Sequence, residues 1–205
     1  MSIPPATPRR LLTVTEYLAV EARATTRHEY VHGRVYAMAG ESRAHTQIAL
    51  NVASRLRAAA RGGPCRVAME GVRVVVDGGV QYYPDVMVAC GPAPDDPLVE
   101  NAPCLLVEVL SPSTRRTDRR EKGPAYRAIA SLHAYVIVYQ DRRRVEWYAR
   151  AADGEWTVAD LVGDGTVHFP CPGAPGGPVD MTFDEIYEDV ALPPARVPRR
   201  SPPPS

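Results

Sequence analysis

The chain has 205 residues, of which 45% are hydrophobic, enough for one domain with a full apolar core. Its 24 basic and 24 acidic residues cancel, which excludes a non-specific attraction to nucleic acid through overall positive charge. No stretch reaches the roughly 18 apolar residues of a membrane helix, and residues 1–10 lack the apolar segment of a signal peptide, so we expect a cytoplasmic protein.

The N-terminal third predicts a short helix, a hairpin and a long helix. Thr13 precedes a run from Glu16 onward that is typical of a short capped helix. Aromatic and β-branched residues on both sides of Gly33 favour a β-hairpin over 28–38. Over 44–61, apolar residues recur at helical spacing until glycines stop the run, which predicts the main amphipathic helix.

The middle of the chain is rich in β-branched and apolar residues and predicts the strands of one sheet core. A polar helix over 117–130 follows, with Pro124 early in it or at a kink. A second hairpin, a further strand and a short last helix complete the elements. The expected strands after the first hairpin are 65–69, 72–76, 85–90, 104–110, 134–139, 144–148 and 155–161, and the last helix is 182–188.

The two ends of the chain differ from the middle in composition. From Leu192 onward, proline, arginine and serine leave almost nothing to bury. We therefore expect a flexible N-terminus over 1–11, one α/β domain over 12–190 and a disordered Pro/Arg tail over 191–205.

The four cysteines, Cys65, Cys90, Cys104 and Cys171, are widely spaced along the chain. No pair has the short C-x-x-C spacing that is typical of a zinc site. We expect all four to be small, buried apolar residues of a protein that is kept reduced.

Asp85 and Glu108 are the first candidates for chemistry. Asp85 opens one apolar strand, and Glu108 is the lone charge within another, where a charge needs a partner. If the two strands are neighbours, their backbones lie roughly 4.8 Å apart, so both carboxylates can converge on one hard cation such as Mg²⁺. If the carboxylates lie on opposite faces of the sheet, such a site cannot form.

The strand over 104–110 alternates between two faces. Glu108 shares its face with Leu106 and Leu110, and the residues between them point to the opposite layer. Because both faces are apolar, the pattern predicts a strand covered on both sides, as in an α/β core.

Lys122 is the one lysine among 24 lysine and arginine residues, and it follows Glu108 in the chain. This asymmetry indicates a position that does not accept arginine. Lysine is a compact charge whose pKa of roughly 10.4 can be lowered, whereas arginine stays protonated as a planar fork. A site that orients water near a metal can need the former, although Lys122 also fits a solvated helix face.

Pro84-Asp85 and Glu108-Val109-Leu110 resemble the two halves of the PD-(D/E)XK signature of restriction-endonuclease-like nucleases, except that Leu110 stands at the usual lysine position. A longer set of residues resembles, in order and spacing, the Uma-two family of bacterial endonuclease-like proteins over about 12–190. The set comprises Glu29-Tyr-Val-His-Gly-Arg-Val-Tyr-Ala-Met, His45, Tyr83-Pro-Asp-Val, Glu108-Val-Leu-Ser-Pro-Ser-Thr, Asp118, Lys122, Tyr126 and Tyr135-Val-Ile-Val. The resemblance implies an α/β, restriction-endonuclease-like fold with a mixed central β-sheet flanked by helices.

The same resemblance implies metal-assisted hydrolysis of phosphodiester bonds, with Mg²⁺ as cofactor and Mn²⁺ as its substitute. Asp85 and Glu108 would ligate the metal, and the carbonyl of Val109 would be a further ligand. In this family the signature lysine has moved onto the following helix, a place that Lys122 matches. Lys122 would orient the attacking water or neutralise charge on the phosphorane oxygens.

Two more residues are candidates for an additional site. Glu29 matches the early acidic residue of the family pattern and would bind a second metal or hold a water. His45, near the start of the main helix, could contact phosphate or the metal's outer shell. The structural alternatives are an exposed hairpin charge for Glu29 and a helix-cap residue for His45, while Tyr126 is expected to serve packing.

The predicted function is magnesium-dependent cleavage of DNA by an endonuclease. A group of arginines beside the expected metal site would seat phosphates, or would form a solvated face. The group consists of Arg115, Arg116, Arg119 and Arg120. The alternatives are a catalytically inactive nuclease-fold module that binds nucleic acid or a protein partner, and a phosphoesterase whose cleft is closed over by the loop at 92–103. Since nucleases that cut two strands commonly pair two sites, a homodimer is expected.

Overall fold

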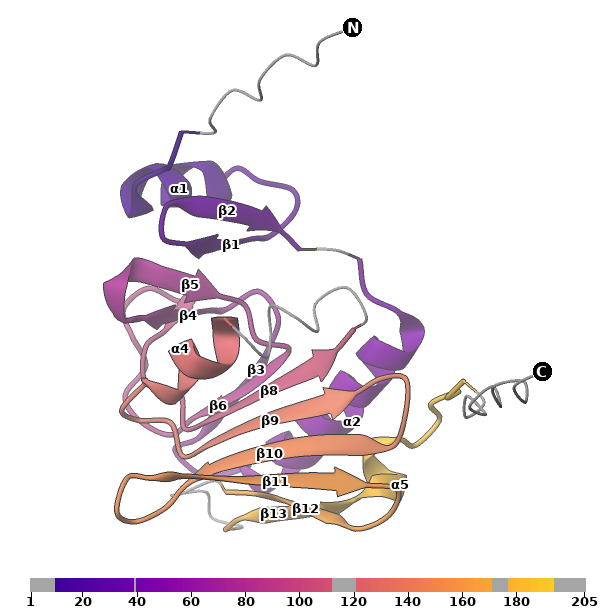
Figure 1. Ribbon diagram of the computed structural model, residues 1–205. Helices are drawn as coiled ribbons and strands as arrows, with labels where there is room; N and C mark the ends of the chain where they lie inside the picture. Colours follow the sequence, from indigo (N-terminus) through magenta and orange to yellow (C-terminus); the bar gives the residue numbers. More distant parts are fainter. Residues whose placement is uncertain (1–9, 39, 112–120, 171–176, 194–205) are drawn as a thin grey trace, which may run out of the picture.

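Figure 1 shows the computed structural model, which describes residues 10–38, 40–111, 121–170 and 177–193. A central six-stranded sheet lies between helix α2 (Arg43–Ala59) on one side and the short helix α4 (Gly123–Arg127) on the other, and a second, smaller sheet lies beside it. The expected α/β fold with a mixed central sheet flanked by helices is confirmed. The predicted domain limits at 12 and 190 remain predictions.

The central sheet has the order β11-β10-β9-β8-β6-β3. Its strands are β3 (Arg66–Met69), β6 (Val86–Ala89), β8 (Leu105–Leu110), β9 (Ala134–Tyr139), β10 (Arg144–Arg150) and β11 (Trp156–Val162). β8 and β9 are parallel and the other neighbours are antiparallel, so the sheet is mixed. Every residue of β8 and β9 is buried, as expected for strands covered on both faces.

A second sheet, with the order β2-β1-β5-β4-β7, corrects the expectation that all middle strands form one sheet. Its strands are β1 (His28–Val31), β2 (Arg34–Ala37), β4 (Arg73–Val76), β5 (Val80–Tyr82) and β7 (Val99–Glu100). The physical reason is local: Gly78 and Gly79 adopt positive φ within the short 3₁₀ turn η1 (Asp77–Gly79), which folds β4 back onto β5 instead of onto β3. A separate pair, β12 (Thr166–Phe169) and β13 (Val179–Thr182), completes the strands.

Three of the described helices begin directly after a capping residue that the sequence offers. α1 (Val14–Glu21) starts after Thr13 with a capping box, and α2 (Arg43–Ala59) starts after Ser42. α5 (Phe183–Ile186) starts after Thr182. Of the helix expected over 117–130, the structure describes residue 121 onward, with α4 at Gly123–Arg127 and Pro124 early, as predicted.

Two apolar cores cover the two faces of β8. Leu106 and Leu110 pack with Tyr126 and its neighbours on the side of α4. The alternate residues of β8 pack with Val52 and other residues of α2 on the opposite side. The predicted alternation, with Glu108 on the face of Leu106 and Leu110, is therefore confirmed.

The cysteines differ from the expectation. Cys65 and Cys90 form a disulfide, so the prediction of reduced, apolar cysteines is wrong for this pair. They meet because β3 and β6 are antiparallel with Arg66 opposite Ala89, which brings the preceding and following residues together. Cys104 is buried in the core, as predicted, and Cys171 lies outside the described residues.

Across the described ranges, none of the helices is both long and apolar enough to cross a membrane.

Candidate active site

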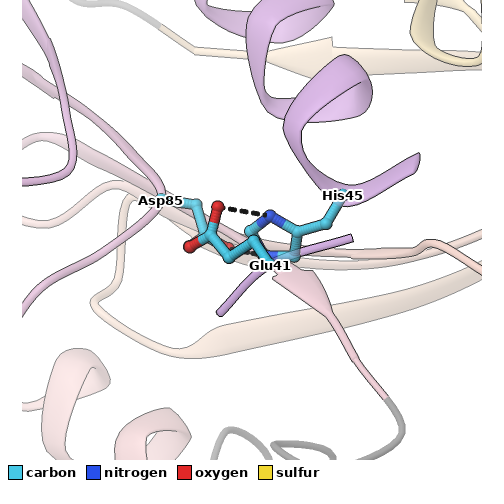
Figure 2. A group of neighbouring side chains, drawn as sticks. All are labelled: Glu41, His45 and Asp85. Carbon is cyan, nitrogen blue, oxygen red and sulfur yellow. Dashed lines mark ion pairs between the residues drawn. The ribbon is translucent and has the colours of Figure 1, made fainter. Parts of the chain in front are cut away.

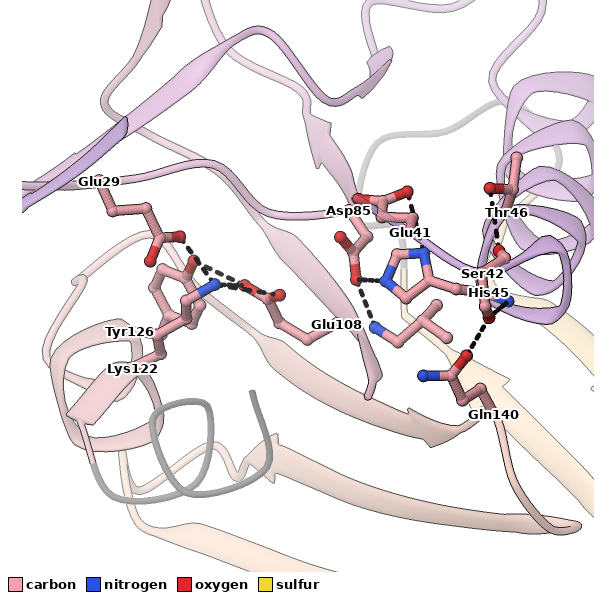
Figure 3. Close-up of polar contacts among 11 residues, drawn as sticks. Glu29, Glu41, Ser42, His45, Thr46, Asp85, Glu108, Lys122, Tyr126 and Gln140 are labelled. Carbon is pink, nitrogen blue, oxygen red and sulfur yellow. Dashed lines mark hydrogen bonds and ion pairs between the residues drawn. The ribbon is translucent and has the colours of Figure 1, made fainter. Parts of the chain in front are cut away.

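The candidate site lies at one end of the central sheet, where four elements meet. β6 runs antiparallel to β8 with Val86 opposite Val107, so Asp85, just before β6, comes beside Glu108 in the sheet. β9 ends at the same edge because it is parallel to β8. The first turn of α2, which carries His45, covers this edge (Figure 3).

Lys122 lies between two carboxylates. Its Nζ is 2.8 Å from Oε1 of Glu29 and 3.1 and 3.3 Å from the two carboxylate oxygens of Glu108. Only 5% of Lys122 and 3% of Glu108 is exposed. The alternative of a solvated helix face for Lys122 is therefore wrong.

Tyr126 supports this cluster as well as packing in the core. Its hydroxyl donates to Oε1 of Glu108 at 2.9 Å. Complete burial, reinforced by the charges of Glu108 and Glu29, raises the pKa of Tyr126 well above its ordinary value. The phenol therefore keeps its proton and holds the Glu108 carboxylate in place.

Glu29 connects the Lys122 cluster to the segment that carries Asp85. The backbone N–H of Tyr83, two residues before Asp85, donates to Oε1 of Glu29 at 3.4 Å. Because Glu29 is buried, the alternative of an exposed hairpin charge is wrong.

Asp85 belongs to a second cluster, drawn in Figure 2. Its Oδ2 is 3.1 Å from Nε2 of His45 and accepts a hydrogen bond of 2.5 Å from the backbone N–H of Val109. The other ring nitrogen of His45, Nδ1, is 3.1 Å from Oε2 of Glu41. His45 thus bridges two carboxylates, as Lys122 does.

The two carboxylates make His45 a cation. Burial alone would lower the pKa of this histidine, but hydrogen bonds and charge from Asp85 and Glu41 outweigh burial and raise it to about 10. The backbone that carries the ring is also held, because the Oγ of Ser42 accepts from the His45 backbone N–H at 3.1 Å and itself bonds Gln140, just after β9. A protonated imidazole cannot ligate a metal, so a cation and the proton compete here.

Glu41 and Glu70 are candidate residues that the sequence analysis missed. For Glu41 a signal exists, because it directly precedes Ser42, the capping residue of the helix whose first turn carries His45, and acidic residues are favoured at a helix N-terminus. For Glu70 the signal is long-range: Met69 pairs with Val86, so Glu70 comes beside Asp85. Burial and the nearby charge of Glu41 raise the pKa of Glu70, whereas the bond to His45 lowers that of Glu41.

The structure divides the expected residues into two adjoining clusters. Glu108 points toward Lys122 and Tyr126, whereas Asp85 points toward His45 (Figure 3). The clusters touch at β8, because the Val109 N–H that binds Asp85 belongs to the peptide bond that follows Glu108. Coordination of one cation by Asp85, Glu108 and the Val109 carbonyl stays a prediction.

One group of described residues has the donor atoms of a metal site. A ligand atom from each of Glu41, His45 and Asp85 lies within 4.8 Å of the other two. Carboxylate oxygens suit Mg²⁺ and Mn²⁺, and an imidazole nitrogen adds affinity for transition metals. The donor set therefore fits a divalent cation once His45 has lost its proton.

The predicted phosphate-binding arginines, Arg115, Arg116, Arg119 and Arg120, lie outside the described residues. The loop at 92–103, by contrast, connects the end of β6 to the start of β8. Both of these strand ends are remote from Asp85, which precedes β6. The loop therefore starts and finishes at the edge of the sheet away from the candidate site, which argues against a small-phosphate cleft closed by it.

Comparisons with known proteins agree with this fold. A family described as "Uma2: Putative restriction endonuclease" matches residues 14–181. The uncharacterized protein slr1290 of Synechocystis sp. is 33% identical over 191 residues, covering 92% of this chain and 97% of its own. The uncharacterized protein sll1609 of the same organism is 30% identical over 162 residues, covering 76% and 90%.

A solved structure also resembles this fold. It is described as a "putative nuclease belonging to DUF820" from Anabaena variabilis. The TM-score is 0.67 at 19% identity, and the match covers 86% of this chain and 97% of that one. At this identity the likeness establishes the shared fold.

Proposed function

The chain belongs to the Uma2 family of restriction-endonuclease type, and from this premise we propose that it is a metal-dependent endonuclease that hydrolyses phosphodiester bonds in DNA. The observation that carries the proposal is the pair of charged clusters on either side of Glu108-Val109, each with two carboxylates around one cationic side chain. Burying charge is costly, and a surplus of carboxylates at a sheet edge is typical of a site that receives a cation.

Asp85 is central to metal binding in this proposal. It would hold Mg²⁺ or Mn²⁺ together with Glu108 and the Val109 carbonyl, or together with Glu41 and His45. The bound cation would supply a Lewis acid that polarises a phosphoryl oxygen and lowers the pKa of a water molecule.

Lys122 would act on the phosphate. Its ammonium, held by Glu29 and Glu108, is a fixed positive charge at the edge of the sheet. Such a charge stabilises negative charge that gathers on the phosphoryl oxygens during attack, and it needs no reorganisation because the two carboxylates and the Tyr126 phenol already fix the geometry. The arginines at 115, 116, 119 and 120 would bind neighbouring phosphates.

Nucleases that cut both strands commonly pair two such sites, so the proposal includes a homodimer. Its two copies would each act on one strand of the duplex. Light scattering of the purified protein, alone and with DNA, checks this part separately.

A second candidate is a catalytically inactive nuclease-fold module that binds nucleic acid or a protein. One observation favours it: in each cluster a side-chain cation already neutralises part of the negative charge, so the clusters are partly balanced without a metal. Titration calorimetry with MgCl₂ and MnCl₂ separates the two candidates. If the wild-type protein binds Mg²⁺ or Mn²⁺ and Asp85→Asn does not, the result supports the metal-dependent enzyme. If the wild-type protein binds neither cation, the result supports the inactive module.

The direct test is nicking of supercoiled plasmid by the purified protein with Mg²⁺ or Mn²⁺, with chelator as the blank. Asp85→Asn and Glu108→Gln are expected to abolish cleavage while retaining the wild-type circular dichroism spectrum. Asp153→Asn, on the exposed turn before β11, serves as a matched charge control and should cleave like wild type. Equal nicking by the wild-type protein and Asp85→Asn would refute the proposal.

A further inference from the structure

Three cysteines gather at the end of the central sheet that is remote from Asp85. Cys65 precedes β3, Cys90 follows β6, and Cys104 precedes β8, and these three strands are neighbours. Cys65 and Cys90 form the disulfide, and the Sγ of Cys104 is 3.5 Å from the Sγ of Cys90. A disulfide bond and a cysteine thiol are thus in van der Waals contact.

We propose that these residues form a thiol–disulfide exchange centre in which Cys90 changes partner between Cys65 and Cys104. In the forward step the Cys104 thiolate attacks Sγ of Cys90. A Cys90–Cys104 bond forms, the Cys65–Cys90 bond breaks, and Cys65 leaves with the electron pair and takes up the proton that Cys104 lost. One disulfide and one thiol stand on each side of the step, so the exchange needs no external oxidant or reductant.

The contacts and exposure of the three cysteines indicate which sulfur an external thiol would attack. Cys104 contacts Cys90 and donates its S–H to the carbonyl of Val88 at 3.3 Å, which holds the thiol against the strand that leads to Cys90. Cys65 and Cys104 are buried, whereas Cys90 is partly exposed. An external thiol would therefore enter at Cys90, the sulfur that both bonds share.

The exchange changes which strands are covalently joined. The Cys65–Cys90 bond ties β3, and through it the chain segment after α2, to β6. The Cys90–Cys104 bond would instead join β6, which follows Asp85, to β8, which contains Glu108. β3, which follows Cys65, would then be joined to β6 by backbone pairing alone. The centre is independent of nuclease activity, because it depends on the three sulfurs alone.

The test maps disulfides in the full-length chain with Cys171→Ser, which removes the fourth cysteine. The protein is incubated in native buffer with reduced and oxidised glutathione, trapped with an alkylating agent, and digested with a Glu-specific protease. Cleavage after Glu70 and Glu100 separates all three cysteines, whereas trypsin leaves Cys90 and Cys104 in one peptide because no arginine or lysine lies between them.

We expect both Cys65–Cys90 and Cys90–Cys104 peptides, in a ratio that stays constant across the glutathione redox series because the two forms are equally oxidised, while the fraction with all three thiols reduced rises as the buffer becomes more reducing. Adding Cys65→Ser should shift Cys90 entirely to Cys104, and adding Cys104→Ser should leave only Cys65–Cys90. The proposal is overturned if Cys65→Ser gives glutathionylated Cys90 with Cys104 still a thiol, or if Cys90→Ser yields a Cys65–Cys104 bond. The redox series on the parent protein contains no core substitution, so it remains decisive if a variant does not fold.

Discussion

Replacing Lys122 with methionine tests whether this side chain is the internal cation of the site. Methionine keeps the apolar stem and removes the charge. Glu29 and Glu108 are 9% and 3% exposed, so the change strands two buried carboxylates beside each other. Breaking a buried ion pair by removing one partner costs about 3–5 kcal/mol. For a chain of this size, each kcal/mol lowers Tm by roughly 2–4 °C, so a fall of about 6–20 °C is expected.

The assay is thermal and urea denaturation followed by circular dichroism at pH 7, in chelator and then in excess MgCl₂. The matched control is Lys122→Met with Glu108→Gln, which removes one stranded charge and should regain a large part of the lost stability. Because a cation can take the place of the ammonium, MgCl₂ should stabilise Lys122→Met more than wild type. A Lys122→Met protein within 1 kcal/mol of wild type would refute the buried bridge.

Four further changes follow from the same contacts. Lys122→Arg should reduce plasmid nicking roughly 100-fold, because the planar guanidinium cannot occupy a position shaped for a compact charge; wild-type rates would count against this. Tyr126→Phe should cost about 1.5–3 kcal/mol in urea denaturation, because the bond to a carboxylate is lost, and an unchanged midpoint would contradict that bond. Glu41→Gln should weaken Mn²⁺ binding in calorimetry roughly 10- to 100-fold if this carboxylate ligates or orients His45, and unaltered affinity would remove it from the site. The pKa of His45 is raised to about 10 from roughly 6.5 in the unfolded chain, so its stabilising contribution is complete below pH 6.5 and is lost as the pH rises through 10. The free energy of unfolding of the metal-free protein should therefore fall over this pH range, and it should fall less steeply for His45→Gln.

The parts of the fold and site that the sequence predicts are those governed by local periodicity. The alternation in β8 placed Glu108 correctly on the face of Leu106, and the helical spacing of apolar residues located α2 within two residues of its ends. The exclusion of arginine at residue 122 pointed to a position with strict geometry, and the structure has one there.

The parts that the sequence did not predict depend on long-range pairing. The sequence predicts β4 as a strand of the central sheet. In the structure, the turn at Gly78 and Gly79 pairs it with β5 instead. The Cys65–Cys90 bond follows from the register of β3 on β6, which no spacing of cysteines encodes. Glu70 reaches the site by the same register.

The structure changes the reason for a lysine at residue 122. Its single nitrogen lies within 3.3 Å of oxygens from two glutamates on different elements and 5.7 Å from the centre of the Tyr82 ring. A planar fork directs its donors into one plane, whereas an ammonium can direct three donors to separate partners. The buried geometry alone therefore selects lysine over arginine, before any role in orienting water. Catalysis by Lys122 would be a second use of a charge whose position the fold already requires, so cleavage should be compared only among variants whose stability has been measured.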